Sequence, residues 1–349
     1  MSHAITINES IRQMDKGQDQ TFSGTFVDAE TGESGKYGFV ADGHGKNQCI
    51  DCLRAIPRET LDGIIGTAAP VENLAQYVNE YGYVTNINSS GATMCLVKVY
   101  SDRIVIINCG DSQAAVYKNG ELVFLSEEHN CENEKERKRI EKKGVTYEDS
   151  GNFEIVSEIK MVGVTSKYAI FPPHLKLAST QALGHNGRTG LAPDVTVVPF
   201  KPDDKVHVVI GSDGLWDMIL KQNVEEMNSF TSKTSAELVE FAVGRWLQPW
   251  NMHLDKITEV HVLSRFQPKH CDDICVIKID VLPVEVQVKE VEVKAGAEEV
   301  KAGAEEVEAA TEEVEAAGAA GPQPLNNTNI FEPFPIIINN IQNTLRPPE

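Results

Sequence analysis

The sequence predicts an α+β fold in which antiparallel sheets carry helices packed on their outer faces. Three observations lead to this class. Apolar and polar residues alternate with period two along much of the chain between residues 92 and 125, further short runs are rich in Val and Ile, and segments of helical period are fewer. Sheets that need cover from a small number of helices form a layered α+β domain.

The strand signal is strongest in four consecutive runs. Asn119-Gly120 separates the last two, and Asn-Gly is a strong hairpin signal because both residues tolerate positive φ. We therefore predict an antiparallel meander made of Ala92–Tyr100, Ile104–Cys109, Gln113–Lys118 and Leu122–Leu125. Further strands are predicted at Tyr37–Ala41, Val206–Ile210 and Ile274–Ile279.

Two segments have helical features. Asn130 is a candidate N-cap that would place Glu132 and Glu134 in the first turn, and Gly144 would end this helix. Residues 234–248 carry apolar side chains at helical spacing, and Pro249 would end the second helix.

Composition narrows the possible partners and the compartment. The 349 residues carry a net charge of −20, which argues against nucleic acid or an anionic membrane as the main partner. The N-terminus shows no secretory signal, and no apolar run approaches the roughly 20 residues that span a bilayer. The sequence predicts a cytoplasmic or nuclear protein.

The seven cysteines are irregularly spaced, which suits reduced thiols. Cys49 and Cys52 form a C-x-x-C pair that could indicate zinc or redox chemistry, but no second pair follows. We interpret all seven as buried structural thiols.

The composition changes near residue 280. Residues 1–282 are predicted to form the folded domain, and residues 283–349 an acidic, low-complexity tail of repeated Glu, Ala, Val and Gly. One Val in each repeat buries too little surface to offset ordering entropy, so a disordered spacer is favoured over a coiled coil. An apolar patch at residues 330–338 could dock a partner or fold back on the domain.

Two strands run directly into Asp-Gly, at Asp42-Gly43 and Asp213-Gly214, and Asp272-Asp273 precedes a third strand. Carboxylates and an accessible glycine carbonyl at strand ends are the oxygen ligands that Mg²⁺ and Mn²⁺ prefer. A single Asp-Gly is usually only a turn, and Asp62-Gly63 is interpreted as one.

Six motifs in series make the pattern specific. Across residues 15–280 their order resembles that of the type 2C metal-dependent protein phosphatases (the PPM family). The motifs are Asp42-Gly-His-Gly45, Ser90-Gly-Ala-Thr93, Asn108-Cys-Gly-Asp-Ser112, Leu177-Ala-Ser-Thr-Gln-Ala-Leu-Gly184, Ser212-Asp-Gly-Leu-Trp-Asp217 and Cys271-Asp-Asp273.

The resemblance implies a central antiparallel β-sandwich flanked by α-helices, with a binuclear Mg²⁺ or Mn²⁺ centre at one end. Asp42 would bridge the two ions. The implied ligands also include the carbonyl of Gly43 and the carboxylates of Asp19, Asp213 and Asp272, with Asp111 at a weaker third site.

The implied reaction is hydrolysis of phosphoserine or phosphothreonine in proteins, by a water that bridges the metals and without a phospho-enzyme. His44 would protonate the leaving oxygen, a task suited to an imidazole that titrates near pH 7. A structural role for His44 is the alternative.

Several positions depart from the family pattern. The arginine that would grip the phosphate has no clear counterpart, and Arg12 and Lys16 are the candidates. Gln113 and Gln181 replace arginines, His185 replaces an aspartate, and Asp273 replaces an asparagine. A pseudophosphatase that binds phosphoproteins without turnover is therefore the alternative function.

Overall fold

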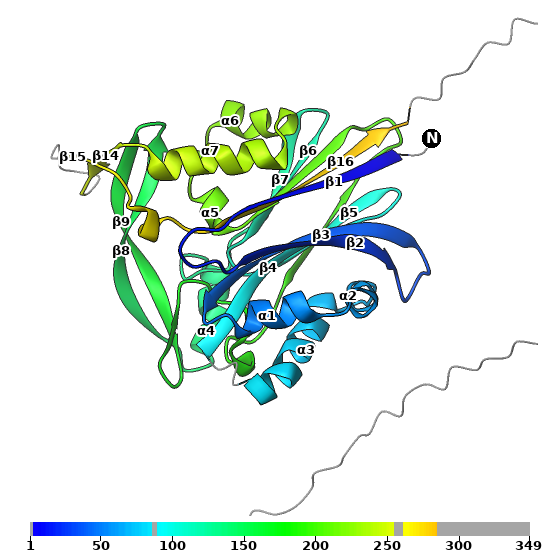
Figure 1. Ribbon diagram of the computed structural model, residues 1–349, viewed down its shortest axis with the longest axis horizontal. Coiled ribbons are helices and arrows are strands. Elements are labelled where there is room, and N and C mark those ends of the chain that lie inside the picture. Colours follow the sequence, from blue (N-terminus) through cyan, green and yellow to red (C-terminus); the bar gives the residue numbers. More distant parts are fainter. Residues whose placement is uncertain (1–2, 86–88, 255–260, 285–349) are drawn as a thin grey trace, which may run out of the picture. The chain divides into compact units, whose positions relative to one another are not determined.

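The computed structural model describes residues 3–85, 89–254 and 261–284. The predicted tail and its apolar patch at residues 330–338 lie outside the described residues. Within that part of the chain, two central sheets face each other and helices cover their outer sides (Figure 1). The predicted α+β class with a central antiparallel β-sandwich is therefore confirmed.

The first central sheet has five strands that are all antiparallel to their neighbours. In spatial order they are β1 (His3–Arg12), β16 (Ile274–Pro283), β13 (Val206–Gly211), β6 (Gln113–Lys118) and β7 (Glu121–Leu125).

The second central sheet is also antiparallel. Its order is β12 (Asp194–Pro199), β5 (Arg103–Cys109), β4 (Ser90–Val99), β3 (Ser34–Gly45) and β2 (Asp19–Val27), and the short β11 (Leu183–Gly184) pairs with β4 beyond the end of β5.

The buried faces of the two sheets form one aliphatic core. Val40, Val97 and Ile106 of the second sheet lie in the same cluster as Val208 and Ile277 of the first, and all five are at most 1% exposed. Removal of this apolar surface from water is the main term that holds the sheets together.

Helices cover each outer face. The second sheet packs against α1 (Gln48–Ala55), α2 (Arg58–Ile65) and α3 (Pro70–Thr85). The first sheet packs against α5 (Asp213–Trp216), α6 (Val224–Ser229) and α7 (Ser235–Leu247). The predicted helix at residues 234–248 is confirmed as α7, and Thr234 and Glu237 form a capping box at its start.

A third sheet lies at one end of the sandwich (Figure 1). It consists of β8 (Thr146–Ser157), β9 (Lys160–Phe171), β10 (Leu175–Leu177), β14 (Trp250–His253) and β15 (His261–Ser264), and β14 pairs with β9 in parallel. We did not predict this sheet. Much of β8 is solvent-exposed and polar, so it has no clear alternation of apolar residues.

Four local predictions were wrong. The four consecutive strands do not form a meander, because β4 pairs with β5 in one sheet while β6 pairs with β7 in the other. Helix α4 (Glu134–Glu141) begins three residues later than predicted, because the side chain of Asn133 accepts hydrogen bonds from the first turn. That helix also ends before Gly144. Asp62-Gly63 is not a turn but lies within α2.

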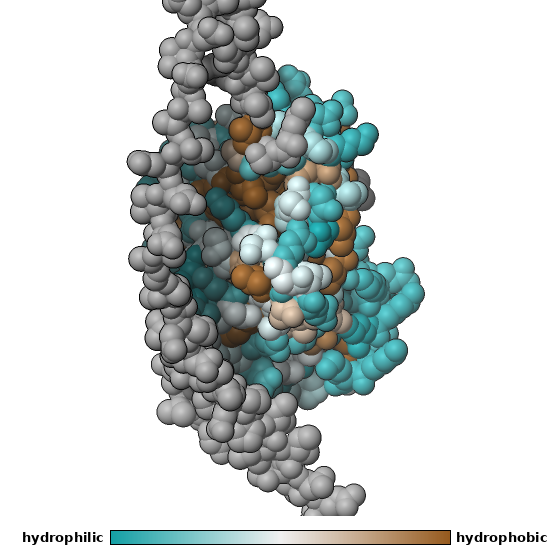
Figure 2. Space-filling model, turned by 90° about the vertical axis from the view of Figure 1, so that its right-hand side faces the viewer, coloured by the Kyte–Doolittle hydropathy of each residue, from teal (hydrophilic) through white to brown (hydrophobic). Residues whose placement is uncertain are grey.

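Figure 2 views the side of the molecule where the β2–β3 hairpin and the end of β16 lie, and it shows apolar surface between hydrophilic side chains. All seven cysteines are buried and free, as predicted. No helix of the described residues has the length and apolar character needed to cross a membrane.

Candidate metal centre

Strand ends of both central sheets bring the predicted carboxylates to one edge. The β2–β3 register places Asp19, the first residue of β2, directly opposite Asp42 near the end of β3. In the other sheet, Asp213 starts α5 just after β13, and Asp272 comes just before β16. Asp111 follows the end of β5.

Three of these carboxylates form a compact group. One oxygen each from Asp42, Asp111 and Asp213 lies within 4.8 Å of the others, and all three side chains are half-buried. These residues come from different strand ends, so the cluster is a product of the tertiary fold. Oxygen atoms at this separation can share one divalent cation.

Several carboxylate oxygens in this region have no protein donor. Asp19 is 1% exposed, and neither of its carboxylate oxygens accepts a hydrogen bond from the described residues. Oδ1 of Asp213 is buried and unpartnered within the same part of the chain. Buried polar atoms without partners are rare and costly, so these oxygens fit a site built to hold cations.

The pKa shifts of these aspartates also favour a cation site. Burial raises the pKa of Asp42 well above its usual range, and the charge of Asp213 raises it further. Burial also raises the pKa of Asp111, again with Asp213 as the next contribution, and it raises the pKa of Asp19. Like charges this close cannot all ionise alone, whereas divalent cations would favour the ionised forms. The residues present therefore fit a site for divalent cations.

Gly43 and Gly214 leave room for the backbone of the segments that contain Gln18 and Asp273. A Cβ on Gly43 would lie 2.7 Å from the carbonyl oxygen of Gln18, and a Cβ on Gly214 would lie 2.0 Å from that of Asp273. Neither glycine is needed for a turn by positive φ: β3 continues past Gly43 to Gly45, which is the residue with positive φ. Close approach of backbones is the reason for glycine at both positions.

Lys16 lies at this edge through its contact with Asp272. Its Nζ is 2.7 Å from Oδ1 and 2.8 Å from Oδ2 of that carboxylate. Burial lowers the pKa of Lys16, but the charge of Asp272 outweighs this and the net shift is upward. Arg12, the other candidate for phosphate binding, is exposed on β1 opposite Ile274 and forms no ion pair with the described residues.

Asp273 has a structural role that the sequence did not reveal. It is 1% exposed, and its carboxylate accepts hydrogen bonds from the backbone N–H groups of Met14 (2.5 Å) and Gln18 (2.7 Å). The side chain of Gln18 donates to the carbonyl of Gly45 (3.1 Å). Asp273 thus anchors the segment that leads into Asp19.

His44 lies two residues after Asp42 on the same strand. Its Nε2 is buried and has no hydrogen-bond partner among the described residues, and its ring stacks on His185 at 5.0 Å between centroids. Burial, together with the charges of His185 and Lys16, lowers the pKa of His44 to about 3. The prediction that His44 titrates near pH 7 is therefore wrong for the chain without bound ligands, in which its imidazole is neutral at that pH.

The glutamines that replace arginines are structural. Gln113 is 3% exposed and donates to the carbonyl of Ser126. Gln181 is fully buried, donates to the carbonyl of Ala192 (3.0 Å) and accepts from its N–H (2.8 Å). Both side chains hold loops next to the site.

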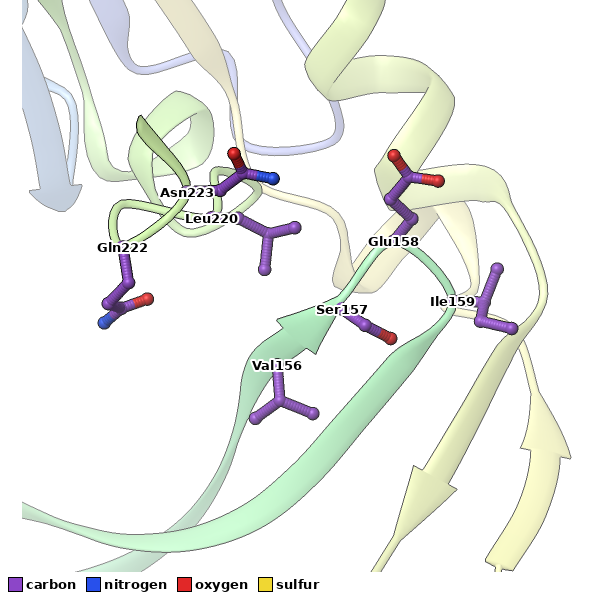
Figure 3. Close-up of a pocket in the computed structure, with 7 residues that line it drawn as sticks. All are labelled: Val156, Ser157, Glu158, Ile159, Leu220, Gln222 and Asn223. Atoms are coloured by element: carbon purple, nitrogen blue, oxygen red, sulfur yellow. The ribbon is translucent and has the colours of Figure 1, made fainter. Parts of the chain in front are cut away.

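A cavity of about 770 Å³ lies beside the end of α5, and no predicted metal ligand lines it. Asp217, one turn after Asp213, lines it together with Trp216, Glu128 and residues of β8 and β9. A second cavity, of about 600 Å³, lies at the tip of the β8–β9 hairpin (Figure 3). Val156 and Ile159 line this second cavity and no predicted metal ligand does, so it is separate from the site.

The comparison with protein families decides the classification. A family model described as protein phosphatase 2C matches residues 68–243, about half of the chain. The chain belongs to the protein phosphatase 2C family. The matched segment contains Asp111, Asp213 and His185, whereas Asp42 and Asp272 lie outside it.

Relatives within the phosphatase 2C family match parts of the chain. "Protein phosphatase ppm-1.G" of Caenorhabditis elegans is 32% identical over 136 residues, which are 39% of this chain and 26% of the relative. "Probable protein phosphatase 2C 24" of Arabidopsis thaliana is 32% identical over 137 residues, 38% of this chain and 32% of the relative. The matches thus span about a quarter to a third of these relatives.

A longer match exists to "Probable protein phosphatase 2C 54" of Oryza sativa subsp. japonica, 28% identical over 218 residues, 59% of this chain and 57% of the relative. Among solved structures, the serine-threonine phosphatase 2C from Toxoplasma gondii superposes with a TM-score of 0.52 at 14% identity, over 80% of this chain and 95% of that one. At this identity the likeness concerns the fold, and it agrees with the sandwich described above.

Proposed function

We propose that this chain is a metal-dependent phosphatase that hydrolyses phosphoserine and phosphothreonine in proteins. The observation that carries the proposal is the group formed by Asp42, Asp111 and Asp213, whose oxygens lie within 4.8 Å of one another at the edge of a phosphatase 2C fold. The buried oxygens of Asp19 support it, because they lie opposite Asp42 and are free to accept a cation.

The ions would be Mg²⁺ or Mn²⁺, which prefer oxygen ligands. Asp42 would help to hold them, together with Asp19, the carbonyl of Gly43, Asp213 and Asp272, and Asp111 would be a further, weaker ligand. When bound, such a pair of ions makes a water molecule acidic enough to act as nucleophile and neutralises charge on the phosphoryl group.

The chain's own side chains then bind and transfer protons. His44 is proposed to donate a proton from Nε2 to the leaving serine or threonine oxygen, since this nitrogen has no partner among the described residues. The imidazole is neutral in the chain by itself, so this role requires that the negative charge of the bound phosphate raises the pKa of His44 and protonates it in the complex. Lys16 is proposed to attract the phosphate, as a point charge without the planar fork of arginine. The cavity of about 770 Å³ beside Asp217 would receive the phosphorylated segment.

A pseudophosphatase that binds phosphoproteins without turnover is the second candidate. The observation that favours it is the pairing of Lys16 with Asp272, at 2.7 Å, because it occupies a proposed metal ligand with a cation of the chain itself. Metal binding would have to displace this lysine. The two candidates differ in whether added cations produce turnover.

The test is hydrolysis of p-nitrophenyl phosphate and of a phosphothreonine peptide with Mn²⁺, with Mg²⁺ and with excess chelator. We expect both reactions to require a divalent cation, and Asp42→Ala to eliminate turnover of both esters. Asp62→Ala is the matched control, because Asp62 also belongs to an Asp-Gly pair but lies in α2. No turnover with either cation would favour the pseudophosphatase, and full activity in chelator would exclude the metal mechanism.

The role of His44 has a separate signature. His44→Ala should slow the peptide reaction by roughly 10²–10⁴, the usual contribution of general acid catalysis. The loss should be smaller for the aryl ester, whose phenoxide leaves without a proton. Equal losses on both esters would contradict the general-acid role and leave the phosphatase assignment intact.

A further inference from the structure

Sheet register brings two histidines to the same glycine. Gly91 lies in β4, where it pairs with His44 of β3 on one side and with Gly184 of β11 on the other. His185 follows Gly184 directly, so both imidazoles approach Gly91 from opposite neighbouring strands. The matching of these two registers is a property of the sheet and is not visible in the sequence.

The two rings are in direct contact above this glycine. Their centroids are 5.0 Å apart with an angle of 26° between the ring planes. A Cβ on Gly91 would lie 2.3 Å from Nε2 of His185 and 2.7 Å from Nε2 of His44. Only glycine at position 91 leaves space for both rings, and the Nε2 atoms of both face the same small volume.

The backbone that carries His185 is held in an unusual conformation. His185 and Asn186 have φ of +49° and +51°, in the left-handed region that non-glycine residues seldom adopt. A Cβ on the preceding Gly184, which also has positive φ, would lie 2.5 Å from the carbonyl oxygen of Ser90. Such conformations are unfavourable for residues other than glycine and persist where the surroundings fix them.

The surrounding contacts do fix this loop. On its far side, Arg139 donates to the carbonyls of Thr189 (3.1 Å), Gly190 (3.3 Å) and Thr180 (2.8 Å). The hydroxyl of Thr189 also donates to the carbonyl of Ala182 (3.1 Å). The loop is thus closed on both sides of His185, whose side chain is 1% exposed.

We propose that His185 is a positioning residue: its ring stacks on His44 and fixes the orientation in which His44 meets the leaving group. The inference rests on the proposed function, in which His44 is the general acid. Proton transfer requires the donor within hydrogen-bond reach of the leaving oxygen, and a misplacement of about 1 Å can cost about 10²-fold in rate.

The experiment compares two replacements of His185. His185→Asn removes the ring but keeps a residue type that tolerates positive φ, whereas His185→Phe keeps a ring that can stack. His174→Asn is the matched control, because His174 also has positive φ (+68°) but is exposed between β9 and β10. For each, kcat is measured with Mn²⁺ on the phosphothreonine peptide and on p-nitrophenyl phosphate.

We expect His185→Asn to lose about 10- to 100-fold on the peptide and clearly less on the aryl ester. His185→Phe should recover most of the peptide rate, and the double variant with His44→Ala should be no slower than His44→Ala alone. Equal losses on both esters, or losses that add fully in the double variant, would overturn the inference. If His185→Asn does not fold, His185→Gly replaces it, because glycine also removes the ring and tolerates positive φ, and the same losses are expected on the two esters.

A second measurement does not depend on turnover. In ¹H–¹⁵N long-range NMR spectra, the His44 ring resonances should move and broaden in His185→Asn and stay close to wild type in His174→Asn. Unchanged His44 resonances in His185→Asn would contradict the positioning role. If wild type hydrolyses neither ester, the proposed function fails, and this spectrum still decides whether His185 orients His44.

Discussion

Gly214→Ala tests whether close backbone approach builds the metal centre. The new Cβ would lie 2.0 Å from the carbonyl oxygen of Asp273, whereas ordinary contact begins at 3.4 Å, so the two segments must separate by about 1.4 Å. Neither partner is a flexible side chain. The strain should cost about 1–3 kcal/mol of folding free energy, the usual price of overpacking.

The same displacement acts on the site. It moves the segment containing Asp272 away from Asp213, so the cation ligands of the first sheet lose their spacing. We expect weaker Mn²⁺ binding and a loss of about 10²-fold in kcat/KM on p-nitrophenyl phosphate, because a shift of about 1 Å is enough for such losses. Calorimetric titration with Mn²⁺, a melting curve and the aryl phosphatase assay measure the three effects.

Gly244→Ala is the matched control on a neighbouring element. Gly244 lies within α7, and a Cβ there would meet nothing within 4 Å. Alanine should stabilise this helix by about 0.5–1 kcal/mol and leave Mn²⁺ binding unchanged. Wild-type Mn²⁺ affinity and activity in Gly214→Ala would show that this close backbone approach does not build the metal centre.

Three further predictions concern support of the site and the chain's domain boundary. Arg139→Met leaves the buried carboxylate of Glu136, which is 1% exposed, without its ion pair. It should lower the free energy of unfolding, measured with denaturant, by about 3–5 kcal/mol. Lys138→Ala, which breaks an exposed ion pair, is the control and should change this free energy by less than about 1 kcal/mol. Burial raises the pKa of Glu136, but the hydrogen bonds from Arg139 and Thr180 outweigh it and the net shift is downward. The stability that Glu136 contributes is therefore present above its unfolded pKa of 4.5 and is lost as pH falls through the folded pKa. The free energies of unfolding of wild type and Glu136→Gln should accordingly converge in acid. A difference that stays constant with pH would contradict this. A chain of residues 1–284 should keep its melting temperature and its kcat on p-nitrophenyl phosphate, and a collapse of either would show that the predicted tail is needed.

The strands and one long helix could be predicted from sequence because their signals are local. Alternation locates the strands β4 to β7, Asn119-Gly120 marks a hairpin, and Thr234 with Glu237 provides the capping box of α7. Alternation reports that a strand is buried but not which strand it pairs with. The meander was therefore wrong although its strands were right.

The carboxylates could also be predicted, because strand–Asp-Gly patterns and the order of six motifs are visible in the sequence. The structure brings Asp42, Asp111 and Asp213 together, and it places Asp19 opposite Asp42. The function of the two glycines could not be predicted, because it depends on which backbone segment passes beside them. The Asp273 anchor is likewise a contact between residues more than 250 positions apart in the chain.

The contact between His44 and His185 could not be predicted from the sequence either. The sequence identified His185 only as a departure from the family pattern. Its contact with His44 arises because β3 and β11 both pair with Gly91 of β4, and β11 is only two residues long. A strand that short has no sequence signature, so the register that creates the contact cannot be inferred in advance.

The central claim is that the aspartates at the sheet edge hold two divalent cations that the reaction requires. Calorimetric titration of the full chain with Mn²⁺, run in parallel with hydrolysis of p-nitrophenyl phosphate, tests it most directly. We predict two bound ions per chain, activity that rises with their occupancy, and loss of both in Asp42→Ala. Wild type that binds no Mn²⁺, or Asp42→Ala that binds and hydrolyses as wild type does, would contradict the claim.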